Sequence, residues 1–185
     1  MCKNNIPAPS MSNNPYKENK RVGTDRKSAV YGLFDALGVK YRVVEHPPMF
    51  SQADSEKHRV VTGTVIFKNL FLRNPDGSRY YMLSLPLEKR ADLAKVREAL
   101  GETRLSFGGE DALYEKLRII PGSVSLLNIV GKPDTDVTFL IDREIMNCES
   151  FGVHPNDNTA TIIFSPLDLE KIFAHFSLIY RLVET

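Results

Sequence analysis

The sequence has few cysteines: only Cys2 and Cys148 occur among its 185 residues, and Cys2 lies in the N-terminal tail. A disulfide framework or a zinc site built from cysteines is therefore not expected, and a reducing, cytoplasmic compartment is the default prediction. Histidine pairs at metal-ligand spacing, such as HxxxH, are absent, and so are a P-loop and a Rossmann fingerprint. We therefore predict no metal and no cofactor.

The chain also lacks an excess of charge and a long apolar run. Its 24 lysines and arginines almost balance its 23 aspartates and glutamates, so the net charge is +1. This balance argues against a protein that coats nucleic acid, although it leaves room for a local site that binds one end of a nucleic acid. No window approaches the length of a membrane-spanning helix, and the N-terminus lacks the apolar centre of a secretory signal. Neither a membrane location nor export is expected.

Composition predicts two regions. Residues 1–23 are rich in Asn, Pro, Ser and Lys, which predicts a disordered extension ahead of one folded domain, residues 24–185. The locally basic stretch 17–27 is interpreted as a solvated tail and helix start, with an accessory contact to phosphates as the alternative.

Within the domain, hydrophobic spacing and turn residues predict helices and strands in irregular order. Helices are predicted at 24–37, 51–60, 91–100, 109–117 and 166–176. Strands are predicted at 40–46, 65–72, 79–86, 119–129, 136–145, 159–164 and, as a final edge strand, 178–183. The strands fall in hairpin-like groups rather than a βαβ repeat, so we predict an α+β domain with a mixed, mostly antiparallel sheet and surrounding helices.

The strand predicted at 65–72 carries two polar residues, Lys68 and Asn69, at its centre. Because side chains alternate along a strand, Phe67, Asn69 and Phe71 are expected on one face, with Lys68 and its apolar neighbours on the other. A buried ammonium must reach solvent, pair with an acid or meet an anionic ligand. The Asn69 amide offers donors and an acceptor, which suit the recognition of a ligand and equally suit hydrogen bonds that hold a loop.

Two loops offer further candidate groups. His154 lies in GVHPNDN, an irregular loop that leads into a strand, where it could act as a general acid or base or be structural. Pro121 and Gly122 force a turn, and the amides after such a turn can cradle a carbonyl. His46 in EHPP could line a cleft. There is no GxSxG nucleophile motif, so the residues alone predict a pocket and no specific reaction.

Five short motifs occur in a specific order: EHPP at 45–48, KNLFL at 68–72, LSFG at 105–108, PGSV at 121–124 and HPNDNTAT at 154–161. In this combination the sequence closely resembles the YbaK/ProX superfamily of aminoacyl-tRNA editing domains. Within it, the chain is most similar to the freestanding ProX (PrdX-like) deacylases, which act on mischarged proline tRNA. The resemblance covers roughly residues 25–183.

The resemblance implies an α+β domain whose sheet surrounds an aminoacyl pocket, and an enzyme that hydrolyses the ester between a wrong amino acid and the terminal adenosine of tRNA. It implies that Lys68 engages the phosphate or adenosine end of this substrate and that Asn69 helps to orient the same end. A charge-assisted contact of this kind is typically worth ~1.5–3 kcal/mol. A phosphate at Lys68 would explain an ammonium in a core strand.

The same resemblance assigns the remaining site residues. The turn at Pro121, Gly122 and Ser123 matches the GxxPG element, whose backbone amides hold the ester end. His154 matches a histidine that family members carry in this loop.

Asn158 and Thr159 would complete the wall of the pocket. No side chain stands out as a general base, so the expected catalysis rests on an oriented water molecule and on stabilisation of the oxyanion.

One position departs from the pattern, because Arg118 replaces the first glycine of GxxPG. Either the turn tolerates a side chain there, or the arginine reaches toward RNA. The whole pattern resembles the alanine-removing members, which predicts Ala-tRNA(Pro) as substrate, and an apolar pocket excludes the larger proline ring by size.

Several alternatives stay open. Cys-tRNA(Pro) is the alternative substrate, and a non-catalytic module that binds the tRNA end is the alternative function. The expected partner is the acceptor end of tRNA(Pro), with prolyl-tRNA synthetase as a possible second partner through the N-terminal tail.

Overall fold

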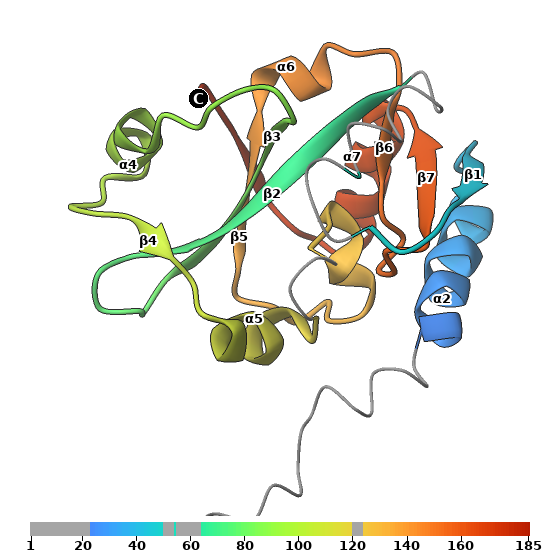
Figure 1. Ribbon diagram of the computed structural model, residues 1–185, viewed down its shortest axis with the longest axis horizontal. Helices are drawn as coiled ribbons and strands as arrows, with labels where there is room; N and C mark the ends of the chain where they lie inside the picture. Colours follow the sequence, from blue (N-terminus) through green and yellow to red (C-terminus); the bar gives the residue numbers. More distant parts are fainter. Residues whose placement is uncertain (1–22, 50–53, 55–63, 120–123) are drawn as a thin grey trace, which may run out of the picture.

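The computed structural model describes residues 23–49, 54, 64–119 and 124–185 (Figure 1). The predicted disordered extension therefore lies outside the described residues except for Gly23. The helix predicted at 51–60 also lies outside them except for Asp54.

The core of the fold is a mixed sheet, as predicted, and it has eight strands in the described residues. Seven strands follow the order β1-β7-β6-β2-β3-β5-β8, and β4 pairs with β2 beside this path. Parallel pairing joins β2 to β6, β3 to β5 and β5 to β8, and the other four pairs are antiparallel. The strands are β1 (Arg42–Glu45), β2 (Val65–Arg73), β3 (Tyr80–Pro86), β4 (Ser106–Phe107), β5 (Thr138–Asp142), β6 (Phe151–Val153), β7 (Ala160–Phe164) and β8 (Tyr180–Val183).

Helices surround this sheet, and their ends follow the cap residues of the sequence. Asp92 accepts hydrogen bonds from two amides at the start of α4, which ends at Gly101 in the left-handed conformation (φ 68°). Ser165 caps α7, whose first residue is Pro166. The helices are α2 (Gly23–Ala36), α4 (Leu93–Leu100), α5 (Glu110–Leu117), α6 (Arg143–Met146), α7 (Pro166–His175) and the 3₁₀ helix η2 (Leu126–Val130).

The two faces of β2 enter two separate apolar clusters, which confirms the alternation expected from the sequence. Phe67 and Phe71 are buried in the larger cluster, to which α2, α5 and α7 contribute side chains. Leu72 is buried in the smaller cluster with Val96 of α4, and Leu70 packs against that cluster. Burying one such side chain stabilises the fold by roughly 1.5–3 kcal/mol. The sheet is therefore held by hydrophobic burial on both of its faces.

Two predicted strands are partly wrong, for the same physical reason. The strand predicted at 119–129 contains η2, because the Ser125 hydroxyl caps this helix and the Asn128 side chain accepts a hydrogen bond from the Ser125 amide at 2.7 Å. The strand predicted at 136–145 stops at Asp142, whose carboxylate caps α6 by accepting from the Glu144 amide. Local side-chain bonds to the backbone thus outweigh a strand-like apolar pattern. The short strands β4 and β6 were not predicted.

Asp142 also ties the C-terminus to the sheet. Its side chain is 1% exposed, lies 2.9 Å from the Lys89 ammonium and accepts hydrogen bonds from the amide and hydroxyl of Thr185. Burial raises the pKa of the Asp142 carboxyl, but the bonds from Thr185, the Glu144 amide and Lys89 outweigh burial and hold the pKa below its ordinary value. Asp142 is therefore a charged, stabilising group of the folded state.

Candidate functional site

Strand pairing is interrupted around the polar pair of β2. One edge of β2 is bonded to β3 over seven residue pairs. The other edge pairs with β6 at residues 65–66 and with β4 at 72–73, near opposite ends of the strand (Figure 1). No strand of the described part of the chain pairs with this edge at residues 67–71. Lys68 and Asn69 lie within that interval.

Lys68 reaches the face of the sheet that carries α4. It is half-buried, and its ammonium donates a hydrogen bond to the carbonyl oxygen of Leu87 at 2.9 Å. Its side chain also lines a cavity of about 420 Å³. The cavity is bordered by Lys68, Leu70, Leu87, Glu88, Arg90, Ala91, Leu93 and Phe107. The lysine is thus neither buried without a partner nor simply directed into solvent.

Asn69 points to the opposite face, where both ends of its amide are engaged. Its oxygen accepts a hydrogen bond from the Ser84 hydroxyl at 2.6 Å, and its nitrogen donates to the Val124 carbonyl oxygen at 2.8 Å. Val124 follows the turn at Pro121, Gly122 and Ser123, which lies outside the described residues. The geometry of Asn69 is that of a residue that holds a loop in place.

His46 and His154 lie together, with ring centroids 5.8 Å apart. The Nδ1 atom of His46 lies 2.8 Å from the Pro47 carbonyl oxygen, which can only accept a hydrogen bond, so Nδ1 carries the proton. In the neutral ring Nε2 then accepts from the Thr161 hydroxyl at 3.1 Å. The two rings come from segments 108 residues apart, which the pairing of both β1 and β6 with β7 brings together.

The histidines and Lys68 belong to the same face of the sheet. Ile66 is in register with Gly152 in the parallel pair of β2 and β6, and Lys68 follows Ile66 by two residues on the same side. A side chain at Gly152 would begin 2.7 Å from the Thr161 methyl group, so Thr161 also faces this side. Thr161 in turn is bonded to His46. Lys68 and the histidine pair therefore lie on the same face of the sheet.

Asn158 and Thr159 join the end of β1 to the loop before β7. The Asn158 side chain donates to the Met49 carbonyl oxygen at 3.0 Å, and the Met49 amide donates to the Asn158 carbonyl oxygen at 3.1 Å. The Thr159 carbonyl oxygen accepts from the His46 amide at 3.0 Å. These two residues fix the position of His46 through the backbone.

Three polar residues near the site were not predicted from the sequence. The Ser125 hydroxyl donates to the His154 carbonyl oxygen at 2.6 Å, and the buried Asn128 amide donates to the Asn156 side chain at 2.8 Å. Asn156 donates to the Leu127 carbonyl oxygen and has a positive φ of 61°. The run of Asn and Asp after His154 was the available signal, since asparagine tolerates this conformation. Together these bonds attach the His154 loop to η2.

The comparison with protein families decides the assignment. Residues 46–172 match the model of the aminoacyl-tRNA editing domain. The chain belongs to this family. The editing domain is an aminoacyl-tRNA hydrolase, a deacylase of mischarged aminoacyl-tRNA.

Individual relatives agree with this assignment. The chain is 34% identical to the prolyl-tRNA editing protein ProX of Acetoanaerobium sticklandii, over 80% of this chain and 90% of the relative. It is 28% identical to prolyl-tRNA synthetase associated domain-containing protein 1 of Mus musculus, over 80% and 89% of the two chains. A solved structure described as a proposed trans-editing enzyme for prolyl tRNA synthetase superposes with a TM-score of 0.63 at 18% identity, covering 86% of this chain and 97% of the other. This last likeness confirms the predicted fold.

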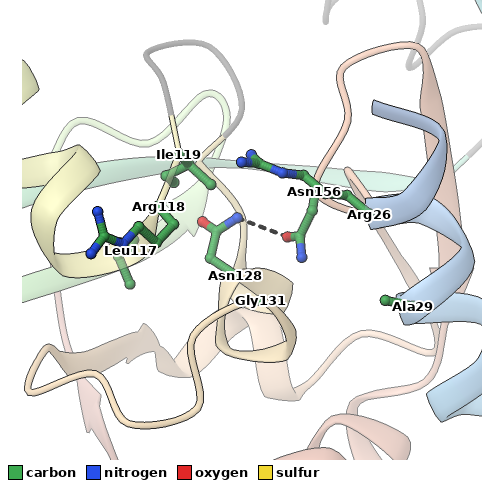
Figure 2. A pocket seen from close by; sticks show the side chains of 8 residues that line it. All are labelled: Arg26, Ala29, Leu117, Arg118, Ile119, Asn128, Gly131 and Asn156. Atoms are coloured by element: carbon green, nitrogen blue, oxygen red, sulfur yellow. Dashed lines mark hydrogen bonds between the residues drawn. The ribbon is translucent and has the colours of Figure 1, made fainter. Parts of the chain in front are cut away.

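A second cavity of the editing domain, of about 290 Å³, is bordered by Arg26, Arg118, Asn128 and Asn156 among others (Figure 2). Arg118 is the C-cap of α5 and adopts the left-handed conformation (φ 56°), in which glycine has no steric penalty. Its guanidinium lies over the Tyr114 ring at 5.3 Å, and Figure 2 shows it directed away from Asn128. The helix end therefore accommodates arginine where the family pattern has glycine.

Two kinds of feature are absent from the described residues. No group of three or more His, Cys, Asp or Glu side chains in that part of the editing domain could hold a metal ion. None of its described helices is long and apolar enough to cross a membrane.

Proposed function

We propose that the editing domain hydrolyses Ala-tRNA(Pro) in trans, releasing alanine from mischarged proline tRNA. Two relatives support proline tRNA as the substrate: one is named a prolyl-tRNA editing protein, the other a prolyl-tRNA synthetase associated protein. The observation that carries the proposal is that Lys68, His46 and His154 lie on the same face of the sheet, with Lys68 at the interruption of pairing beside β2. A substrate end bound across this face meets a cation and two imidazoles.

In this proposal Lys68 binds the phosphate or adenosine end of the tRNA. An ammonium that now donates to the Leu87 carbonyl can exchange that bond for a stronger, charge-assisted contact to a phosphate oxygen. Water attacks the carbonyl carbon of the ester, the bond from this carbon to the ribose oxygen breaks, and the ribose oxygen takes up a proton. The products are alanine and a tRNA with a free terminal hydroxyl group.

The proposed catalysis is mainly orientation. His154 contacts the reacting end, while His46, held by Thr161 and Pro47, borders it. The turn at 121–123 supplies amides to the oxyanion, and Asn69 supports this turn through its bond to Val124. Alanine is preferred over proline because a small pocket excludes a larger ring. Cysteine is of similar size and remains the alternative substrate.

We also propose that residues 1–23 form an extension to the domain 24–185 and that prolyl-tRNA synthetase is its partner in the cytoplasm. The extension lies outside the family match at 46–172. Removing residues 1–23 is expected to weaken binding to the synthetase in a pull-down assay and to leave hydrolysis of free Ala-tRNA(Pro) unchanged. Equal binding by the truncated chain would rule out this role.

The test of the main proposal is a deacylation time course on proline tRNA charged in turn with alanine, cysteine and proline. Loss of alanine with the other two esters intact supports the proposal. Loss of cysteine alone keeps proline-tRNA editing and replaces the substrate. If all three esters decay at the rate of the buffer, the non-catalytic alternative stands.

A further inference from the structure

An exposed aromatic side chain borders the Lys68 cavity. Phe107 is 64% exposed, although it lies in a strand of the sheet. It pairs with Leu72 of β2, and both side chains face the side of the sheet that carries Lys68. An exposed phenyl ring costs hydrophobic stabilisation, and such a ring beside a cavity is a common feature of binding sites.

The backbone on either side of Phe107 is held by β2. The next residue, Gly108, donates its amide to the Phe71 carbonyl oxygen at 2.9 Å. A Cβ atom at Gly108 would lie 2.3 Å from the buried Phe71 ring, so the chain passes as close to this ring as a glycine allows. The pairing of β4 with β2 and this close packing fix Phe107 from both sides. Its exposure is therefore built into the sheet.

The cavity, which Glu88 also borders, combines three kinds of surface that suit a nucleotide. Phe107 offers a flat aromatic face, Leu70, Leu87 and Leu93 offer an apolar wall, and Lys68 with Arg90 offers cationic groups. Proteins bind single-stranded nucleic acid with this combination, in which aromatic rings stack on bases and cations meet phosphates. The volume of about 420 Å³ is within the range of small-molecule sites, which is typically about 300–1,000 Å³.

We propose that Phe107 is the stacking platform for the base of the 3′-terminal nucleoside of the tRNA. The ring of Phe107 lies against the face of the base, and Lys68 is at the phosphate or ribose side of the same nucleoside. This assignment rests on the proposed function, because it places the base of that substrate. It gives a binding role to the LSFG motif, to which the proposed reaction assigns none.

The experiment uses an RNA hairpin with the acceptor stem of tRNA(Pro), in which 2-aminopurine replaces the terminal adenine. Stacking on an aromatic ring quenches the fluorescence of this base. The proteins are wild type, Phe107→Leu, Phe107→Tyr and the control Ile179→Ala, which removes an apolar side chain that is 84% exposed and lies outside the cavity. The KM for Ala-tRNA(Pro) and the melting temperature are measured for each.

We expect wild type and Phe107→Tyr to quench the base, and Phe107→Leu to bind without quenching. The KM of Phe107→Leu should rise by roughly 5- to 100-fold at an unchanged melting temperature. Ile179→Ala should behave as wild type. If Phe107→Leu quenches and hydrolyses as wild type does, the stacking role is overturned and the proposed function stands. If wild type itself hydrolyses no aminoacyl ester, both are overturned.

Discussion

Two lysines of the same region should respond in opposite ways to the same substitution. Lys68→Met removes an ammonium whose bond to protein is to the Leu87 carbonyl oxygen, and Met keeps the apolar stem. Lys89→Met, two residues beyond Leu87, removes the cation beside buried Asp142. We expect Lys68→Met to lose activity and keep stability, and Lys89→Met to lose stability and keep activity per folded molecule.

The magnitudes follow from the contacts. The bond from the Lys68 ammonium to the Leu87 carbonyl has one charged partner, but water competes for the half-buried ammonium, so we expect a net contribution of only about 0.5–1.5 kcal/mol. Lys68→Met should therefore lower the melting temperature by only about 1–6 °C. Losing a charge-assisted contact to the substrate, ~1.5–3 kcal/mol, should reduce kcat/KM roughly 10- to 150-fold. Removal of Lys89 leaves a carboxylate buried without its cation. Since the Lys89 side chain is 23% exposed and Asp142 keeps other donors, the expected loss is about 2–3 kcal/mol, or about 4–12 °C.

The assays are deacylation kinetics on Ala-tRNA(Pro) and thermal unfolding followed by circular dichroism. Each variant is the control for the other, because both remove one ammonium from nearby segments. The reasoning is refuted if Lys68→Met unfolds many degrees lower and retains its kcat/KM. Lys68 would then be a structural residue that holds the segment after β3.

Three further predictions concern other parts of the molecule. His154→Ala should weaken deacylation and leave the melting temperature nearly unchanged, and full activity would remove His154 from the site. Gly108→Ala should destabilise the fold by about 1–3 kcal/mol in a denaturant titration, because its Cβ overlaps the Phe71 ring; an unchanged midpoint would contradict this packing. The pKa of Asp142 is lower in the folded state than in the unfolded state, where it is about 4, so the ionised carboxylate stabilises the fold at higher pH. This stabilisation is lost as the pH falls through the folded-state pKa. Asp142→Asn should therefore have a lower free energy of unfolding than wild type at pH 7, and this free energy should fall less than that of wild type below pH 4. An equal fall in both proteins below pH 4 would argue against this role.

The sequence predicted the regular elements whose signals are local. In β2 the alternation of apolar residues fixed both faces, and the structure places Phe67 and Leu72 in separate clusters as expected. The helix predicted to begin at Pro166 likewise begins there, directly after its cap residue Ser165. Such signals depend on neighbours within one or two turns of chain, which a single sequence displays directly.

The sequence did not predict how the site is held together. Asn69 bonds to a carbonyl 55 residues away, and Ser125 bonds to one 29 residues away. The partners of these bonds are backbone carbonyl groups, which every residue has. The type of the partner residue therefore gives no sign of the bond in the sequence. For Asn69 the sequence left recognition and loop support equally open, and only the fold shows the bond to Val124.

The two polar residues in the middle of β2 therefore have separate tasks on separate faces. An apolar residue in place of Lys68 would complete the wall of leucines in the cavity and leave no cation there. Asn69 bonds to Val124 on one face of the strand, and Lys68 lines the cavity on the other. This division predicts that Asn69→Leu harms activity through the loss of the bond to Val124, whereas Lys68→Met harms it through the loss of a charge.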